Sequence, residues 1–203
     1  MKKKYIFFFV ISFSLVRLSA QLPVGTFREH LPYDNFKSVA VAPDAVYAAG
    51  ETSILRFNKQ DKSLSTWSKI DGLSDVGISK LYYLNEKNTL IIAYQNANLD
   101  FVKENQLLNM PDIKNKQIIG SKTINNFFVY DNYLYLSCGF GVVVLNTDNF
   151  LVKETWFTRT ANKNYEVKEM TASRNKFFIA TDDGLFFTPT NNPNIADFST
   201  WEP

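Results

Sequence analysis

Residues 133–145 have the sequence YLYLSCGFGVVVL, in which two apolar runs flank a short turn that contains Gly141. Tyr, Leu and Val favour pleated, half-buried strands, and two such runs joined by a short turn are typical of a β-hairpin. The run GVVVL is apolar at successive positions, which is typical of a strand buried on both faces. This stretch therefore predicts a hairpin in the interior of an all-β fold, and the 15% aromatic content of the chain favours the same class.

The hairpin pattern of residues 133–145 occurs four times, and the other copies are 45–57, 89–101 and 176–188. Each first strand ends in a small residue, and these residues recur at intervals of 43 or 44: Ala49, Ala93, Ser137 and Ala180. A second small residue follows four positions later, where we expect a tight turn or a close backbone approach between blades: Ser53, Ala97, Gly141 and Gly184. Repeats of about 40–45 residues with four strands are the signature of a β-propeller.

Two further strands complete each predicted blade. An apolar stretch precedes each hairpin, at 39–41, 78–84, 124–130 and 167–172. A Thr-Trp phrase follows the hairpin and marks the outer strand, at Trp67, Trp156 and Trp201. The second repeat has Met110-Pro111 at this place, so we expect a degenerate outer strand there. The predicted blades are 36–77, 78–120, 124–166 and 167–203. The alternative is an ordinary β-sandwich with accidental internal similarity.

A fifth copy of the outer-strand phrase lies near the start of the chain, at Gly25-Thr26-Phe27. Propellers often close by lending an N-terminal strand to the last blade, which removes a free sheet edge. Five outer strands and four inner sets do not match a closed four-bladed ring. We therefore expect Phe27 to complete a later blade, so that residues 21–203 are the opening four blades of a larger, incomplete propeller. A four-bladed ring with a loose tail is the alternative, and an open arc is expected to expose an apolar blade face.

Residues 1–20 predict an export signal. Lys2–Lys4 form its positive start, and an apolar run of about 12 residues follows. Cleavage is expected between Ala20 and Gln21, because small residues precede this bond. The apolar run is short for a membrane span, and a retained N-terminal anchor is the alternative. We expect the mature chain to have no membrane span and to be located in the periplasm or at the outer-membrane cell surface.

Composition argues against several classes of function. The formal net charge of +2 includes Lys2–Lys4 and Arg17 and becomes negative without the export signal, so the alkaline pI does not predict nucleic-acid binding. His30 is the only histidine and Cys138 the only cysteine, which disfavours a zinc site, a Ser-His-Asp relay and an intrachain disulfide. Cys138 ends an apolar strand and is expected to be a core residue. No catalytic, cofactor-binding or metal-binding residue is predicted.

A few weaker candidates for a site remain. The stretch Gly139-Phe140-Gly141 lacks the third glycine and the following helix of a dinucleotide-binding loop. The pair Asp182-Asp183 has carboxylates for calcium, but ordinary turn residues are the preferred interpretation. Tyr33, Phe36 and Tyr165 are candidates for contact with a sugar or a protein, and packing between blades is the alternative for all three.

Several stretches carry a resemblance to a known family. Residues 25–33 (GTFREHLPY) resemble the start of the PorZ-type proteins of the type IX secretion system. Residues 38–59 and the WSKIDGL stretch at 67–73 resemble the first blade of that family. Residues 180–186 (ATDDGLF) are similar to the wider class of two-component-regulator-type propeller repeats. The resemblance covers essentially the whole of residues 21–203.

The resemblance implies a function at the cell surface. Members of the family carry two propellers and a C-terminal sorting domain, and with the sortase-like protease PorU they help transfer secreted cargo onto anionic lipopolysaccharide. This chain departs from that plan because it holds only part of the first propeller, so any polysaccharide contact of the C-terminal domain would involve regions absent here. We expect a non-enzymatic, cofactor-free scaffold that docks proteins. The alternatives are a glycan-sensing extracellular propeller of a hybrid two-component regulator and a propeller hydrolase or lyase, which the poverty of histidine and clustered acids disfavours.

Overall fold

The computed structural model describes residues 35–104 and 106–203. Several predicted features lie outside the described residues: the export signal 1–20, the cleavage site at Ala20 and Gln21, the outer-strand phrase at Phe27, and the candidates His30 and Tyr33.

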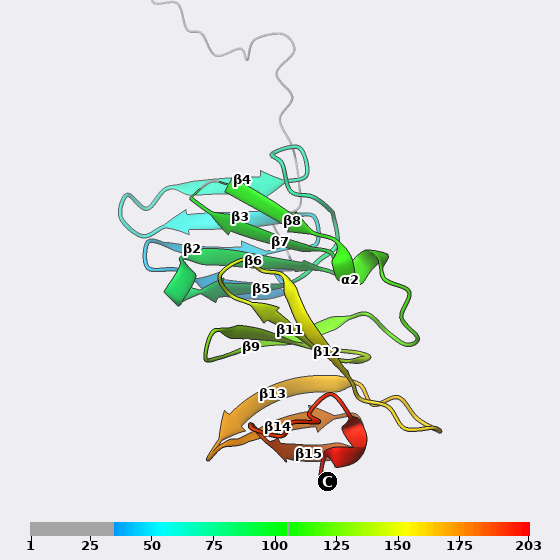
Figure 1. Ribbon diagram of the computed structural model, residues 1–203. Helices are drawn as coiled ribbons and strands as arrows, with labels where there is room; N and C mark the ends of the chain where they lie inside the picture. Colours follow the sequence, from blue (N-terminus) through cyan, green and yellow to red (C-terminus); the bar gives the residue numbers. More distant parts are fainter. Residues whose placement is uncertain (1–34, 105) are drawn as a thin grey trace, which may run out of the picture. The chain divides into compact units, whose positions relative to one another are not determined.

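The described residues form four antiparallel sheets, each built from consecutive strands (Figure 1). The first sheet contains β1 (Ser38–Val41), β2 (Ala45–Ala49), β3 (Ser53–Asn58) and β4 (Leu64–Ser68). The second contains β5 (Ile78–Leu84), β6 (Thr89–Tyr94), β7 (Leu99–Lys103) and β8 (Gln106–Met110). The third contains β9 (Ile124–Tyr130), β10 (Tyr133–Cys138), β11 (Gly141–Asn146) and β12 (Val152–Phe157). The fourth contains β13 (Val167–Ser173), β14 (Lys176–Thr181) and β15 (Gly184–Pro189). Short helical turns lie outside the sheets: η1 (Asn85–Lys87), α2 (Asp112–Asn115) and η2 (Phe198–Thr200).

Backbone pairing explains the regular spacing of the small residues. In each hairpin the small residue near the end of one strand pairs with the first apolar residue of the next. The pairs are Ala49 with Ile54, Ala93 with Leu99, Ser137 with Val142 and Ala180 with Leu185. The four hairpins therefore pair in the same way, with one extra turn residue in the second, and the predicted repeat is confirmed as a structural repeat.

The first strands of successive sheets lie side by side and are joined by hydrogen bonds. The backbone N–H of Leu81 donates to Ser38 Oγ at 2.9 Å, which links β5 to β1. Lys80 Nζ donates to the carbonyl oxygen of Asn125 at 2.7 Å, and Asn125 Nδ2 donates to the carbonyl oxygen of Val167 at 2.7 Å. The first and fourth sheets lie at opposite ends of this open array (Figure 1). The predicted incomplete four-blade propeller is therefore confirmed, and the β-sandwich and closed-ring alternatives are wrong.

Apolar side chains pack in each of the three interfaces between neighbouring sheets. All residues of β6 are buried, and so are residues 141–145 of β11. This confirms that the LIIAY and GVVVL runs are buried on both faces, because each of these strands lies between two neighbouring sheets. The outer face of β1 differs: Val39 is 58% exposed and Val41 56% exposed. The expected exposed apolar blade face is therefore present on the first sheet.

The outer strand of the second sheet is fully formed, so the prediction of a degenerate strand is wrong. Met110 pairs with Leu99, as Trp67 pairs with Ile54 and Trp156 with Val142. Met110 is also buried. The strand forms because any apolar side chain of suitable size can fill this position, and methionine adapts well to irregular gaps.

The last Thr-Trp phrase does not mark a regular strand, in contrast to the prediction. Thr200 ends the turn η2, and the fourth strand is reduced to a single bridge between Phe187 and Glu202. Local hydrogen bonds explain the difference. The carboxylate of Asp197 accepts from the backbone N–H of Ser199 at 3.0 Å, and Trp201 Nε1 donates to the carbonyl oxygen of Ile195 at 2.9 Å. These contacts favour a capped turn over an extended strand.

Candidate functional site

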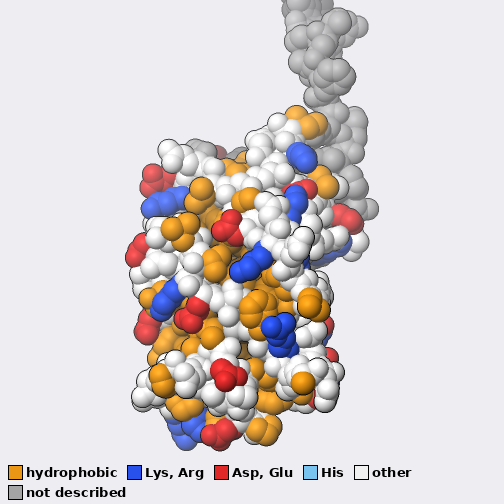
Figure 2. All heavy atoms as spheres, turned by 45° about the vertical axis from the view of Figure 1, so that its right-hand side comes forward, with side chains coloured by type: hydrophobic (Ala, Val, Ile, Leu, Met, Phe, Trp, Pro, Cys, Tyr) orange, Lys and Arg blue, Asp and Glu red, His pale blue; other side chains and the backbone are white. Residues whose placement is uncertain are grey.

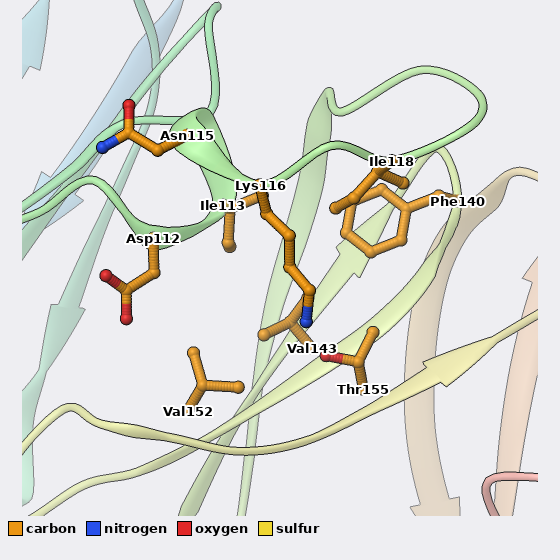
Figure 3. A pocket seen from close by; sticks show the side chains of 9 residues that line it. All are labelled: Asp112, Ile113, Asn115, Lys116, Ile118, Phe140, Val143, Val152 and Thr155. Atoms are coloured by element: carbon orange, nitrogen blue, oxygen red, sulfur yellow. The ribbon is translucent and has the colours of Figure 1, made fainter.

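The connection between the second and third sheets holds the first candidate site. Residues 111–123 form the longest of the three connections between sheets, the others being 69–77 and 158–166. A pocket of about 430 Å³, named here the α2 hollow, lies between this connection and the third sheet (Figure 3). It is lined by Asp112, Ile113, Asn115, Lys116 and Ile118 of the connection and by Phe140, Val143, Val152 and Thr155 of the third sheet.

Helix α2 is held in place by an ion pair to the preceding connection. Lys114 Nζ lies 2.7 Å from Asp75 Oδ2, and Asn96 Nδ2 donates to the same oxygen at 2.6 Å. The Lys114 ammonium, assisted by these hydrogen bonds, lowers the pKa of Asp75 to about 2 against the opposing effect of burial. Ile113 is buried in the core beneath the helix. The position of α2 therefore depends on one partly buried ion pair and one apolar anchor.

The α2 hollow has an apolar floor and a charged rim. Val143 and Val152 lie on the strands below the connection, and the side chain of Lys116 extends over the hollow in Figure 3. Lys116 makes no ion pair within residues 35–104 and 106–203. Ile119, next to the lining residue Ile118, is 77% exposed. The hollow therefore combines an apolar floor with one negative and one positive lining side chain, Asp112 and Lys116.

A buried polar cluster in the second sheet escaped the sequence analysis. Asp100 is completely buried, and its carboxylate accepts from the Tyr94 hydroxyl at 2.6 Å, from Asn109 Nδ2 at 2.8 Å and from the backbone N–H of Ser74 at 2.9 Å. The available signal was an aspartate between the apolar residues Leu99 and Phe101. The cluster is enclosed by protein, so it stabilises the blade and does not form a site open to ligands.

Three residues singled out in the sequence, Cys138, Tyr165 and Phe36, lie within the described residues. Cys138 is fully buried, as expected, and burial raises the pKa of its thiol. Tyr165 is half-buried and packs against Phe186 and Phe198, both of the fourth predicted blade. Phe36 is 41% exposed.

The pair Asp182 and Asp183 forms the turn between β14 and β15. Asp182 Oδ1 accepts from the backbone N–H of Glu166 at 2.9 Å, and Asp183 Oδ2 lies 2.9 Å from Lys163 Nζ. Among the described residues, no group of three or more His, Cys, Asp or Glu side chains is arranged to hold a metal ion. In the same part of the chain, no helix has the length and apolar character that a bilayer crossing requires.

Comparison with known proteins gives a consistent family and fold. The family model of the N-terminal β-propeller domain of PorZ, of the type IX secretion system, matches residues 46–202. PorZ of Porphyromonas gingivalis aligns with a TM-score of 0.71 at 23% identity, over 82% of this chain and 22% of that chain. BT4673 of B. thetaiotaomicron, described as the extracellular domain of a hybrid two-component system, aligns with a TM-score of 0.62 at 14% identity, over 85% of this chain and 23% of that chain. The computationally designed protein Ika4 gives a TM-score of 0.57 at 12% identity, over 81% of this chain and 99% of that chain. A comparison with curated proteins gave no significant match.

The structural likenesses, all below 25% identity, show the fold and no more. The chain spans about a fifth of the length of PorZ and of BT4673. The family model, in contrast, covers most of the chain, from the second strand of the first sheet to the end of the fourth. The chain therefore belongs to the family of PorZ N-terminal β-propeller domains of the type IX secretion system.

Proposed function

We propose that this chain is an exported, non-enzymatic propeller scaffold that docks a protein partner of the type IX secretion machinery at the cell surface. Its partners are other secretion-system proteins, and the family resemblance points to the sortase-like protease PorU. The proposal applies the role that the family resemblance implies to a chain that spans only about a fifth of the length of PorZ. The alternative role, a glycan sensor of a hybrid two-component regulator, depends on likeness of fold alone, and fold does not assign function.

The α2 hollow is the observation that carries the docking proposal. Its floor is formed by apolar side chains of the third sheet, and the Lys116 side chain extends among the lining residues in Figure 3. A partner that inserts an apolar side chain covers Val143 and Val152, and a carboxylate beside that side chain pairs with Lys116. Buried apolar anchors surrounded by a polar rim are the usual source of affinity in such contacts.

The charges on the surface agree with docking through local contacts. Hydrophobic side chains lie between scattered Lys, Arg, Asp and Glu side chains on the face drawn in Figure 2, which shows no broad area of one charge. This face therefore offers no basis for long-range attraction to a polyanion or a polycation. Recognition instead depends on shape and on single charges such as that of Lys116.

A binding experiment with two variants tests this proposal. The Lys116→Glu variant reverses the charge at the rim, and Thr155→Trp fills the hollow from a half-buried position on β12. The chain is immobilised and titrated with the purified PorU-type protease of the same bacterium in biolayer interferometry. We expect binding that each variant weakens by about tenfold or more.

The control variant Lys103→Glu makes the same charge reversal on β7, at an exposed lysine that does not line the hollow. It should bind like the unaltered chain, and thermal unfolding should show that all variants are folded. Absence of binding to PorU would overturn the proposed partner. Equal binding by the unaltered chain and both hollow variants would overturn the proposed site.

A further inference from the structure

A second hollow, of about 560 Å³, lies between the first and second sheets. We name it the first-interface hollow, and its volume lies within the range of about 300–1,000 Å³ that is usual for ligand sites. Six of its lining residues are aromatic or charged: Asp44, Tyr47, Arg56, Trp67, Tyr83 and Glu104. It shares no lining residue with the α2 hollow, so the two sites are separate.

Two rows of side chains face each other across this hollow. On the first sheet, Tyr47 pairs with Arg56, and Arg56 pairs with Ser65 across the outer strand. On the second sheet, Tyr83 pairs with Leu90, and Leu90 pairs with Val102. The row on the first sheet is therefore largely polar, whereas the row on the second sheet is largely apolar and is flanked by Asn88 and Glu104. This arrangement places hydrogen-bonding groups opposite apolar surface inside one cavity.

The repeats of the propeller supply an internal comparison for Arg56. The residues that match Tyr47 and Arg56 by strand register are Ile91 and Phe101 in the second sheet. Phe101 is buried and stacks on Phe150, with ring centroids 4.1 Å apart. The matching pair in the third sheet is Tyr135 and Val144, both buried. The other two interfaces are thus packed by apolar side chains at this position, so the fold itself does not require a charged residue there.

The hollow combines aromatic faces with charged groups. The rings of Tyr47 and Trp67 lie 6.0 Å apart at 41°. Arg56 Nη2 lies 3.0 Å from Asp44 Oδ2, and the Arg56 side chain is 25% exposed. The Tyr47 hydroxyl and the Asp44 carboxylate raise the pKa of Arg56, so the guanidinium remains charged. A planar guanidinium and a carboxylate side by side offer fixed donors and acceptors at the edge of an aromatic surface.

Charge decides which class of ligand fits. Asp44 and Glu104 contribute two negative charges against the one positive charge of Arg56, which disfavours phosphate, sulfate and other anionic groups. A cationic group over the Tyr47 ring is also disfavoured, because it would lie beside the Arg56 guanidinium, which already contacts the Tyr47 hydroxyl. A neutral sugar satisfies both conditions, because its C–H face packs on an aromatic ring while its hydroxyl groups bond to Arg56 and Asp44.

A third, smaller hollow of about 250 Å³ extends the same surface. It shares Trp67 and Val102 with the first-interface hollow, and Asp71 adds a carboxylate to its lining. Trp67 therefore contacts both hollows, and its indole is only partly buried. In the third sheet the matching Trp156 is 3% exposed and is enclosed by Tyr135 and Phe177.

We propose that the first-interface hollow binds a neutral oligosaccharide, with one sugar ring packed against Trp67 and its hydroxyl groups bonded to Arg56 and Asp44. The adjoining hollow accommodates the next sugar of the chain. This inference does not depend on the docking role, which uses other residues and another class of partner.

The test uses the chain with a panel of defined probes. The panel contains neutral hexasaccharides of glucose and of mannose, a chondroitin sulfate fragment, and a lysine-rich peptide. Isothermal titration calorimetry and quenching of tryptophan fluorescence measure binding. We expect at least one neutral hexasaccharide to bind, and we expect neither the anionic fragment nor the peptide to do so.

Two variants tie binding to the hollow. Arg56→Met keeps an unbranched side chain but removes the hydrogen-bond donors, and it should lower the affinity by about tenfold or more. Ser65→Trp fills the hollow from an exposed position on β4 and should abolish binding. The control Arg159→Met makes the same change at an exposed arginine in the connection 158–166 and should leave the affinity unchanged.

Three outcomes would overturn the proposal. The first is that no neutral hexasaccharide binds. The second is that the sulfated fragment or the lysine-rich peptide binds in a way that depends on Arg56. The third is that folded Arg56→Met and folded Ser65→Trp both bind the sugar like the unaltered chain. Circular dichroism and thermal unfolding establish that each variant is folded. If Arg56→Met proves unfolded, Ser65→Trp alone decides the result.

Discussion

The hydroxyl of Tyr94 donates a hydrogen bond of 2.6 Å to the Asp100 carboxylate, and both residues are completely buried in the second sheet. Burial and the bond to Asp100 raise the pKa of Tyr94, so the hydroxyl keeps its proton and remains a donor. Asp100 pairs with Ile92 on the neighbouring strand, whereas the matching position in the first sheet is Leu55 and in the third sheet Val143. The second blade therefore has a buried carboxylate where these two have apolar side chains.

Replacing Asp100 should strongly destabilise the chain. The Asp100→Ala variant leaves the Tyr94 hydroxyl and the Asn109 amide without their buried acceptor, and we expect a loss of about 3 kcal/mol in the free energy of unfolding. Urea denaturation followed by circular dichroism measures the change. Tyr94→Phe removes one donor only and should cost about 1 kcal/mol. Equal stability of Asp100→Ala and the unaltered chain would show that the cluster contributes nothing.

Gly141 should not tolerate a side chain. A Cβ atom at this position would lie 2.0 Å from the carbonyl oxygen of Trp156 on the neighbouring strand of the same sheet. The close approach predicted for this position is therefore real, but it occurs within a blade and not between blades. We expect Gly141→Ala to cost more than about 3 kcal/mol, because strain at φ +142° adds to the clash.

Gly184 supplies the matched control for this substitution. Its φ of +129° is similar, but a Cβ atom there would meet nothing within 4 Å. Gly184→Ala should therefore cost only about 1–2 kcal/mol, from backbone strain alone. Thermal unfolding of the two variants provides the comparison, and a smaller effect at Gly141 than at Gly184 would contradict the steric argument.

The ion pair between Asp75 and Lys114 should make stability depend on acid. Because the pKa of Asp75 is lowered to about 2 in the folded chain, its stabilising effect is fully present above about pH 4 and is lost as the pH falls towards 2. Urea denaturation at intervals between pH 6 and pH 2.5 should therefore show a steeper loss for the unaltered chain than for Asp75→Asn. Lys114→Met should flatten the profile in the same way, and a profile identical in all three proteins would exclude this ion pair as the cause.

Cys138 should be unreactive in the folded chain. The thiol is fully buried, and burial raises its pKa, so little thiolate is present at neutral pH. Ellman's reagent should detect no thiol in the native chain and one thiol per chain in urea, since Cys138 is the sole cysteine. Rapid reaction without denaturant would contradict the burial of the Cys138 thiol on β10.

The strands were predictable wherever burial alone determines them. The hairpins at 45–57, 89–101, 133–145 and 176–188 follow from apolar runs, because a strand between two sheets must be apolar on both faces. The outer strand at Met110 is not evident from the sequence because the Thr-Trp phrase is missing there, whereas the position requires only an apolar side chain opposite Leu99. Trp201 was misjudged because the hydrogen bonds of Asp197 stabilise a turn before it.

The α2 hollow and the first-interface hollow could not be predicted, because each depends on contacts between segments far apart in the sequence. Lys114 reaches Asp75 across 39 positions, and this ion pair positions α2 above the third sheet. Arg56 looks like an ordinary strand residue in the sequence. Only the register with Tyr47 and the packing of the second sheet place it in a cavity.

The amino-acid sequence by itself determined the all-β class, the repeat of about 44 residues and the inner strands of four blades. It did so because a strand buried between two sheets must be apolar along its own length, which is a local property of the sequence. Only the tertiary structure decided where the sheets leave space between them and which polar groups border that space. The physical reason is that a cavity is formed by side chains from two sheets, and its shape depends on how those sheets pack against each other.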